Sequence, residues 1–238
     1  KISPKMRLAV LIFAHCEPET VERLMLSLRG DAAKVFLHVN ARVDSRPFLE
    51  RAPANVPLVE AEKRFELDWG SSAFLIAVLN LLRQAIRDPS GPFDYFLLCS
   101  GQDCCIRQPG ELLAKLEAEP FEYIRANPAQ HRKQRYIRHH FQPGPKHGGV
   151  WLKCLRRILR ALPPRQYEIF LGNRILAAGR PWWCLSRDAI SHVLRDLEEN
   201  PEILAPFIDS FAAEELFFST AIYNSPFQER VRDCLTFV

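Results

Sequence analysis

Apolar residues follow two distinct patterns along the first half of the chain. Short continuous apolar runs predict buried strands, over residues 8–14, 35–39, 56–59 and 94–99. Segments with apolar residues at helical spacing predict helices, over residues 19–28, 71–86 and 111–116. Ser71 or Ser72 stands where the second of these helices begins and is expected to cap it. The first half therefore reads as strands that alternate with helices.

The second half of the chain is less regular. Residues 127–149 are polar, basic and interrupted by proline and glycine, and a loop of that length is usually functional or disordered. Beyond it the pattern predicts an arginine-rich helix, a short strand and two further helices, over residues 151–162, 182–185, 187–198 and 216–222. Ser186 is the expected cap of the helix at residues 187–198.

The alternation of strands and helices predicts the α/β class, with a mostly parallel central sheet flanked by helices. A chain of 238 residues can form one large domain or two small ones. Ligands of such sheets bind beyond the carboxyl ends of the strands. The residues that directly follow the predicted strands are therefore candidates for a binding site, and they include His15, Asn40, Ser100 and Asp103.

Composition narrows the functional classes. A hydrophobic content of 47% with 25% charged residues is typical of a soluble globular protein, and the apolar run at residues 8–14 is too short to span a bilayer. The seven cysteines are odd in number and contain no Cys-x-x-Cys pair. This argues against a zinc site or a disulfide framework and favours a reducing compartment.

The net charge of +4 is modest, but arginine, lysine and histidine gather between residues 125 and 153. Two interpretations of this segment stay open: an anionic ligand that passes close to it, and a solvated loop. We expect no nucleic-acid partner, because no recognised nucleic-acid motif accompanies the charge and aromatic residues are not interleaved with it as stacking platforms.

Two adjacent carboxylates, Glu214 and Glu215, stand directly before the helix expected at residues 216–222. A helix N-terminus would hold such groups ionised and directed into a cleft, which suits a general base. Acidic residues in a first helical turn also complement the helix dipole without any catalytic role. The pair alone leaves both interpretations open.

Several segments match, in order, the pattern of one known family. They are residues 38–40 (His-Val-Asn), 69–72 (Trp-Gly-Ser-Ser), 95–103 (Tyr-Phe-Leu-Leu-Cys-Ser-Gly-Gln-Asp) and 179–187 (Gly-Arg-Pro-Trp-Trp-Cys-Leu-Ser-Arg), followed by the glutamate pair. The chain resembles the core-2/I-branching glycosyltransferases, a family that also contains the peptide xylosyltransferases, over about residues 7–225. We expect a bacterial member.

The resemblance implies a GT-A-like nucleotide-sugar fold that inverts the anomeric centre and needs no metal or other cofactor. The family's Pro-Asp-Glu is similar to Ala213-Glu214-Glu215, which places the catalytic base at Glu215. An inverting transfer is a single in-line displacement, so one base and no protein nucleophile agrees with this assignment. Burial among neighbouring tryptophan and phenylalanine side chains would raise the pKa of this carboxylate and make it a better base.

The resemblance also implies a UDP-sugar donor site. Its expected members are His15, Val39, Asn40, Trp69, Gly70, Ser100, Asp103, Arg230 and Arg232. The family's His-Val-Asp is His38-Val39-Asn40 here, so the contact to the nucleoside would be uncharged. Asp103 matches the family, whereas Cys104-Cys105 replaces its Phe-Pro.

Basic side chains must neutralise the departing diphosphate, because no Asp-x-Asp for a metal occurs in the sequence. Arg230 and Arg232, which follow the glutamate pair, are the nearest candidates, and Arg135, Arg138 or Arg180 could replace them. The acceptor is expected to contact Arg135, Tyr136, Trp182, Trp183 and Glu214. The tryptophans can stack on sugar faces, but core packing is an equally good interpretation of each.

We therefore expect one domain over residues 1–238, with a nucleotide-binding half at 1–125 and an acceptor and catalytic half at 126–238. It would move N-acetylglucosamine or xylose from UDP to a hydroxyl of an oligosaccharide or glycolipid. We expect it in the cytoplasm, where its mildly basic surface could contact the inner membrane peripherally. Two alternatives stay open: a metal-dependent sugar or nucleotidyl transferase of related fold, and an inactive carbohydrate-binding protein.

Overall fold

The computed structural model describes residues 6–28, 32–107, 109–129, 154, 157–159, 161–164, 166, 168–208 and 210–236. Within these residues a seven-stranded sheet has the order β3-β2-β1-β4-β8-β5-β9. Its strands are β1 (Leu8–Ala14), β2 (Ala33–Val39), β3 (Leu58–Glu60), β4 (Tyr95–Ser100), β5 (Glu122–Tyr123), β8 (Cys184–Ser186) and β9 (Val231–Arg232). A separate two-stranded sheet pairs β6 (Asn127–Pro128) with β7 (Ala177–Ala178).

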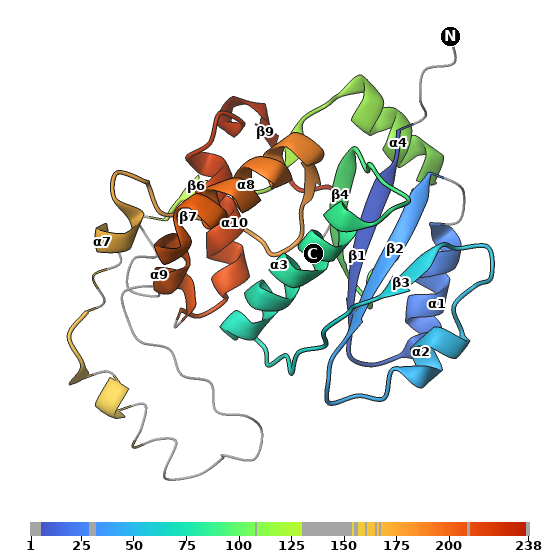
Figure 1. Ribbon diagram of the computed structural model, residues 1–238, viewed down its shortest axis with the longest axis horizontal. Coiled ribbons are helices and arrows are strands. Elements are labelled where there is room, and N and C mark those ends of the chain that lie inside the picture. Colours follow the sequence, from blue (N-terminus) through green and yellow to red (C-terminus); the bar gives the residue numbers. More distant parts are fainter. Residues whose placement is uncertain are drawn as a thin grey trace.

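The centre of the sheet is parallel. Strand β1 pairs in parallel with both β2 and β4, and β2 pairs in parallel with β3. Strand β8 is antiparallel to β4 and to β5. The predicted α/β class, with a mostly parallel sheet, is therefore confirmed, and the carboxyl ends of β1, β2 and β4 meet at one edge (Figure 1).

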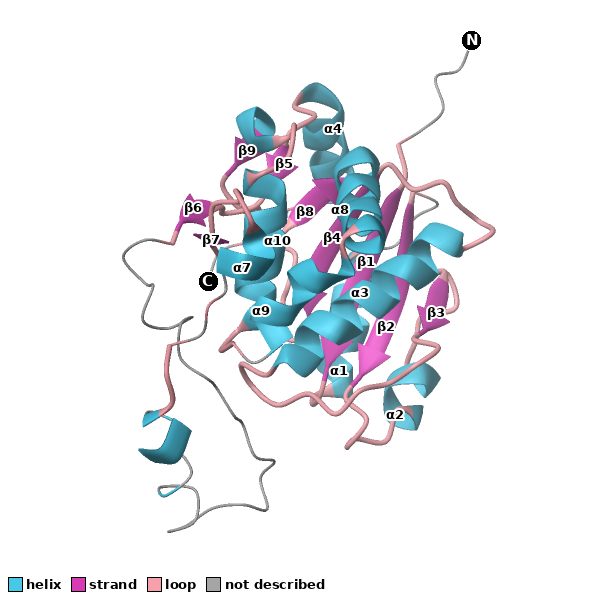
Figure 2. Ribbon diagram, turned by 60° about the vertical axis from the view of Figure 1, so that its left-hand side comes forward, coloured by secondary structure: helices cyan, strands magenta, loops and turns pink. Residues whose placement is uncertain are grey.

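The helices cover both faces of this sheet (Figure 2). They are α1 (Pro18–Ser27), α2 (Arg46–Glu50), α3 (Ser72–Arg87), α4 (Pro109–Ala118), α7 (Glu168–Leu171), α8 (Arg187–Glu199), α9 (Ala205–Ile208) and α10 (Ala213–Tyr223), with 3-10 turns at Pro201–Leu204 and Gln228–Arg230. Alternate residues of β1 divide the core: Ala9 and Leu11 pack with α3, α8 and α10, whereas Val10 and Ile12 pack with α1, α2 and α4. Because β1 is buried on both faces, its sequence is a continuous apolar run.

The predicted elements agree closely with these bounds in the first half. The predicted strand at residues 8–14 coincides with β1, and the capping role of Ser186 is confirmed by the bond that its hydroxyl accepts from the Ala189 amide at 3.2 Å. Ser71 occupies the N-cap of α3 but makes no side-chain cap bond. Helix α10 begins earlier than predicted, so the glutamate pair lies within its first turn. The helix expected at residues 151–162 lies largely outside the described residues.

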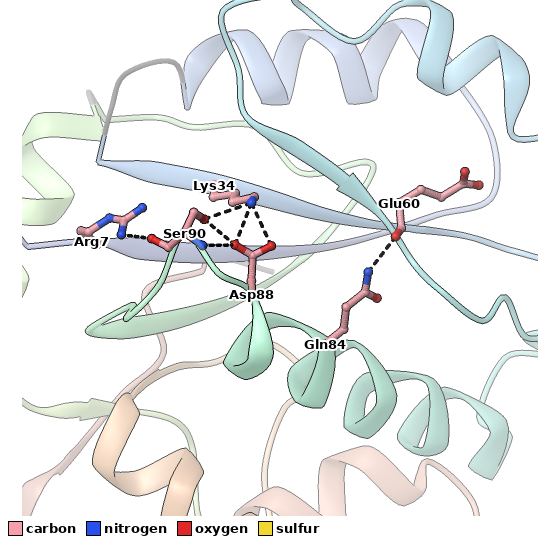
Figure 3. A network of polar contacts seen from close by, with 6 residues as sticks. All are labelled: Arg7, Lys34, Glu60, Gln84, Asp88 and Ser90. Atoms are coloured by element: carbon pink, nitrogen blue, oxygen red, sulfur yellow. Dashed lines mark hydrogen bonds and ion pairs between the residues drawn. The ribbon is translucent and has the colours of Figure 1, made fainter.

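A polar network fixes α3 to the amino ends of the strands (Figure 3). Lys34 Nζ lies 2.8 Å from the Asp88 carboxylate and 3.0 Å from Ser90 Oγ, and Arg7 donates to the Ser90 carbonyl. One turn earlier in α3, Gln84 Nε2 donates to the Glu60 carbonyl at 2.9 Å. These bonds hold the C-terminal half of α3, so its N-terminus is positioned at the carboxyl edge of the sheet.

Candidate active site

A cavity of about 410 Å³ lies at the carboxyl edge of the central strands. Strand ends, the loop before α3, and the segments leading into β8 and α10 form its wall: Phe13, Ala14, His15, Asn40, Leu67, Asp68, Trp69, Gly70, Phe74, Ser100, Pro181, Trp182, Phe211, Ala212, Glu214 and Glu215. The position is the one where open α/β sheets bind ligands, and the volume is within the usual range of small-molecule sites. Residues of both expected halves of the chain, 1–125 and 126–238, line this one cavity. The division into a nucleotide-binding half and an acceptor and catalytic half therefore stays a prediction.

Both polar atoms of the Asn40 side-chain amide form hydrogen bonds to the neighbouring loop. Its Nδ2 donates to the Leu67 carbonyl at 2.8 Å, and its Oδ1 accepts from the Arg42 amide at 3.1 Å. Asn40 is 7% exposed and lies on the cavity wall. An aspartate here would turn a carboxylate oxygen toward the Leu67 carbonyl, so the asparagine suits this loop physically.

His38 lies beneath this wall and is fully buried. Its Nε2 accepts from the Phe65 amide at 2.9 Å, and its ring stacks on Phe13 with the centroids 4.9 Å apart. Burial lowers the pKa of His38 from 6.5 to about 4, so the ring is neutral at physiological pH. His38 therefore supports the strand ends and does not face the cavity.

The Ser-Gly-Gln-Asp turn after β4 reaches the cavity only through Ser100. Asp103 accepts from the Ser100 amide at 2.8 Å and closes its own turn, and burial raises the pKa of its carboxyl. A Cβ at Gly101 would lie 2.9 Å from the Ala14 Cβ, so the glycine permits close packing against β1. Asp103, expected to bind the donor, has a structural role in this turn.

An aromatic rim closes the side of the cavity next to α3. Trp69 is 82% exposed, and its ring meets Phe211 edge to face with centroids 4.9 Å apart. Gly70 has φ of 73°, and a Cβ there would lie 2.5 Å from the Phe211 ring. The Gly70 carbonyl accepts from the Ala212 amide at 2.9 Å. Only glycine satisfies both the backbone conformation and the close approach at this position.

The two glutamates in the first turn of α10 have different environments. Glu214 is 7% exposed, and its Oε2 is buried without a hydrogen-bond partner among the described residues. Burial raises the pKa of Glu214 from 4.5 to about 7, against a backbone hydrogen bond that lowers it, and the charge of Glu215 adds a smaller rise. Glu215 is half-buried, and its main-chain carbonyl accepts from the Gly179 amide at 3.0 Å. Both residues line the cavity.

The tryptophan pair divides between cavity and core. Trp182 lines the cavity wall, as the stacking hypothesis requires. Trp183 is 1% exposed and packs on Phe218 with ring centroids 4.9 Å apart. The expected acceptor contact is wrong for Trp183, because its side chain is enclosed in the core. The side chain of Val39 is likewise fully buried in β2 and cannot reach a donor.

The two arginines expected at the diphosphate lie elsewhere. Arg230 donates to the Pro120 carbonyl at 2.6 Å and lies 3.5 Å from Glu122, whose carboxylate accepts from Ser186. Ser186 pairs with Tyr95 at the amino end of β4, opposite the cavity. Arg232 lies over the Phe121 ring on the outer strand β9. Their assignment to the donor is corrected on this ground: β9 joins the far edge of the sheet.

Other expected contacts fall outside the structural description. Arg135, Tyr136 and Arg138 belong to a segment that the structure does not describe. Among the described lining residues none is a lysine or an arginine. Over the described part of the chain, three or more histidine, cysteine, aspartate or glutamate side chains nowhere gather as a metal site would require. The same part of the chain has no helix with the length and apolar character needed to traverse a bilayer.

Sequence reasoning missed several members of the wall. Phe211 and Ala212 stand in the same run as the glutamates, but the φ of 53° at Ala212 has no sequence signal, because non-glycine residues rarely adopt it. Asp68 was also missed; its carboxylate is paired with Arg42 at 2.5 Å. The Trp-Gly-Ser-Ser motif at residues 69–72 indicated the loop before α3. The close packing of Gly70 against Phe211 explains why this loop forms part of the cavity wall.

The fold and cavity define an α/β protein with a ligand site at the carboxyl edge of its sheet and a carboxylate pair in the wall. Comparison with family models gives the narrower result: the Core-2/I-Branching enzyme model matches residues 19–238. The chain therefore belongs to the core-2/I-branching family of glycosyltransferases.

Comparison with curated proteins finds no match. Among solved structures, S. aureus TarS 1-349 has 13% identity and a TM-score of 0.44, with 95% of this chain and 57% of that chain covered. Mouse xyloside xylosyltransferase 1, in its apo form, has 10% identity and a TM-score of 0.43, with 95% and 84% covered. The chain spans 34% of a longer S. aureus TarS structure.

Proposed function

We propose that this protein is an inverting glycosyltransferase that moves a sugar, N-acetylglucosamine or xylose, from UDP to a hydroxyl of an oligosaccharide or glycolipid. The observation that carries the proposal is the cavity in which strand ends and the first turn of α10 meet, with Glu214 and Glu215 in one wall. Membership of the core-2/I-branching family supports the reaction class.

Glu215 is the proposed base. It is half-buried, lines the cavity and stands in the first turn of a helix, where the dipole favours the ionised carboxylate. A carboxylate here can take the proton of the acceptor hydroxyl while the oxygen attacks the anomeric carbon opposite the UDP leaving group. The reaction then needs no covalent intermediate on the protein.

The donor is proposed to lie along the strand ends. His15, Asn40 and Ser100 line this side of the cavity, and the exposed ring of Trp69 stands at its rim. An exposed indole at the rim of the cavity offers a flat face to a base or a sugar. Trp182, on the other side of the cavity, is the proposed platform for the acceptor.

The charge of the UDP leaving group must also be neutralised. We propose that arginine side chains do this without a metal, with Arg135, Arg138 or Arg180 as the candidates; Arg180 directly precedes the lining residue Pro181. The test is transfer activity after dialysis against EDTA, followed by the variants R135A, R138A and R180A. Activity that requires added divalent metal would favour the alternative of a metal-dependent transferase.

The decisive experiment is E215Q, with E111Q as the matched control. Glu111 is an exposed acid in the first turn of α4, so E111Q makes the same chemical change away from the cavity. We expect E215Q to lower kcat by about 10²- to 10⁴-fold and to keep its affinity for the UDP-sugar. E111Q should behave as the wild type in both measurements.

Two results would contradict this proposal. Unchanged turnover in E215Q would remove Glu215 as the base. Binding of UDP-sugars or glycans without transfer by the wild type would favour the alternative of an inactive carbohydrate-binding protein.

A further inference from the structure

Glu214 has no role in the mechanism above, yet it is the more deeply enclosed of the two carboxyl groups. It is 7% exposed, it lines the cavity, and its Oε2 has no hydrogen-bond partner among the described residues. A buried oxygen in this state costs folding free energy unless a ligand or a proton satisfies it. We therefore expect the Oε2 of Glu214 to gain its hydrogen-bond partner when a ligand fills the cavity.

The described wall around Glu214 contains no lysine or arginine that would hold it ionised. The other titratable groups in the described wall are His15, Asp68 and Glu215, and Asp68 is already paired with Arg42. Of these, Glu215 is the neighbour whose charge opposes ionisation of Glu214. The charge of Glu215 adds to the effect of burial, and both favour the protonated form of Glu214.

Charged groups also lie on the described elements packed against α10 and next to them. The bond from Arg125 lowers the pKa of the Asp233 carboxyl, and Arg180, which follows β7, lies close enough to add to this effect. Strand β7 is Ala177–Ala178, and α9 consists of apolar residues. On α3, Arg83 and Arg87 lie at the end remote from the cavity, beside Glu62. The buried side chains of α8 are apolar; its Arg187 donates to the Phe93 carbonyl and its His192 packs on Phe227.

We propose that Glu214 works as a neutral carboxylic acid, which donates a hydrogen bond from Oε2 to an oxygen of the bound sugar while Glu215 stays ionised as the base. The inference rests on the proposed function and divides two adjacent carboxyl groups by environment: the enclosed one keeps its proton, and the half-buried one accepts the proton of the acceptor hydroxyl. Glu214 is thus a specificity-determining residue, because a ligand without an oxygen at this point leaves its hydrogen unpaired.

The first measurement needs no ligand. Carbon-13 NMR of protein labelled at the glutamate side-chain carboxyls should show one group that titrates near pH 7, consistent with the pKa of about 7 for Glu214. The signal should disappear in E214Q and persist in E111Q. Titration of Glu214 near the ordinary glutamate value would overturn the inference, whether or not the protein transfers sugar.

The second measurement tests the hydrogen bond to the sugar, with UDP-N-acetylglucosamine as the probe in calorimetric titrations from pH 5.5 to 8.5. Wild-type affinity should fall about tenfold for each pH unit above 7, because only the neutral acid donates. E214Q keeps an N–H donor and should bind with little pH dependence. E214M has a similar length but no donor and should bind about tenfold more weakly at pH 6.

The outcomes separate this inference from the proposed function. Wild-type affinity in E214M would overturn the hydrogen bond to the sugar. Loss of turnover in E214Q equal to that in E215Q would show that Glu214 must ionise, which would also overturn the inference. A group titrating near pH 7 in a protein that binds no UDP-sugar would overturn the proposed function and, with it, the role of Glu214 toward a sugar.

Discussion

The two walls of the cavity differ in how their polar groups are satisfied. On the wall formed by strand ends, both polar atoms of the Asn40 amide are bonded to the neighbouring loop. On the wall formed by α10, the buried Oε2 of Glu214 has no partner among the described residues. The contrast is between these two side chains: the Asn40 amide is bonded without a ligand, and the Oε2 of Glu214 is not.

This difference distinguishes side chains that maintain the structure from side chains that interact with a ligand. The hydrogen bonds of the Asn40 amide fix the position of this side chain before any ligand binds. A buried carboxyl oxygen without a hydrogen-bond partner lowers the stability of the folded protein, and a ligand that bonds to it can restore that free energy. Groups with shifted pKa values of this kind are common at functional sites. We expect substitution of Asn40 to alter stability as well as donor binding, and substitution of Glu214 to alter pH dependence and ligand binding.

The largest effect is expected from a substitution at the contact between the two walls, where Gly70 packs against Phe211. G70A places a Cβ 2.5 Å from the Phe211 ring and imposes a φ of 73° on a residue other than glycine. We expect a loss of about 4 kcal/mol in the free energy of unfolding, from backbone strain and overpacking together. Urea denaturation measures it.

G110A is the matched control for this substitution. Gly110 lies in α4 with nothing within 4 Å of an added Cβ, so alanine there should be neutral or slightly stabilising. A G70A protein as stable as the wild type would show that the Phe211 ring moves aside freely and that the rim is not rigid.

The next effect concerns the pH dependence of the free energy of unfolding, to which we expect Glu214 to contribute. The pKa of Glu214 is raised from 4.5 to about 7, so the folded state binds more protons than the unfolded state between these values. Stability from this group is therefore lost as the pH rises through that window, up to about 3 kcal/mol by pH 8. E214Q cannot ionise, so it should be more stable than the wild type at pH 8 and equal to it near pH 4.

Thermal and urea unfolding of the wild type, E214Q and E111Q across this pH range measure the difference. E111Q alters an exposed acid and should leave the pH dependence unchanged. Parallel curves for E214Q and the wild type would mean that Glu214 ionises normally in the folded protein.

A smaller effect is expected on the strand-end wall. N40D replaces the Nδ2 donor with a carboxylate oxygen that faces the Leu67 carbonyl, and we expect a loss of about 2 kcal/mol in the free energy of unfolding. The control is N80D, because Asn80 also donates to a carbonyl, but it is only half-buried and its acceptor, the Ile76 carbonyl, lies in the same helix. N40D should be clearly less stable than N80D in urea; equal stability would contradict the role given to the Asn40 amide.

The smallest effect is expected outside both walls. Arg232 is exposed and lies over the Phe121 ring at 3.9 Å, far from the cavity. R232A should lose about 0.5–1 kcal/mol of stability and keep kcat and the KM for the UDP-sugar within about twofold. A KM raised tenfold or more would restore Arg232 to the donor site and contradict the position of β9.

Sequence patterns predicted the first half of the fold well and the site in part. The run at residues 8–14 was found as β1 because a strand buried on both faces is apolar throughout. The same reasoning placed His15, Asn40 and Ser100 at the cavity, since the carboxyl ends of parallel strands meet at one edge. Short strands such as β5 and β9, with two residues each, carry no periodic signal and were missed.

The sequence by itself determined the α/β alternation, the family pattern and the presence of two adjacent carboxyl groups beside a binding edge. Only the tertiary structure decided that Glu214 is enclosed, that Trp183 belongs to the core, and that Arg230 lies at the far edge of the sheet. The physical reason is that periodicity is a property of neighbouring residues in the chain. Burial and charge environment depend on segments that meet only after folding, as Gly70 meets Phe211.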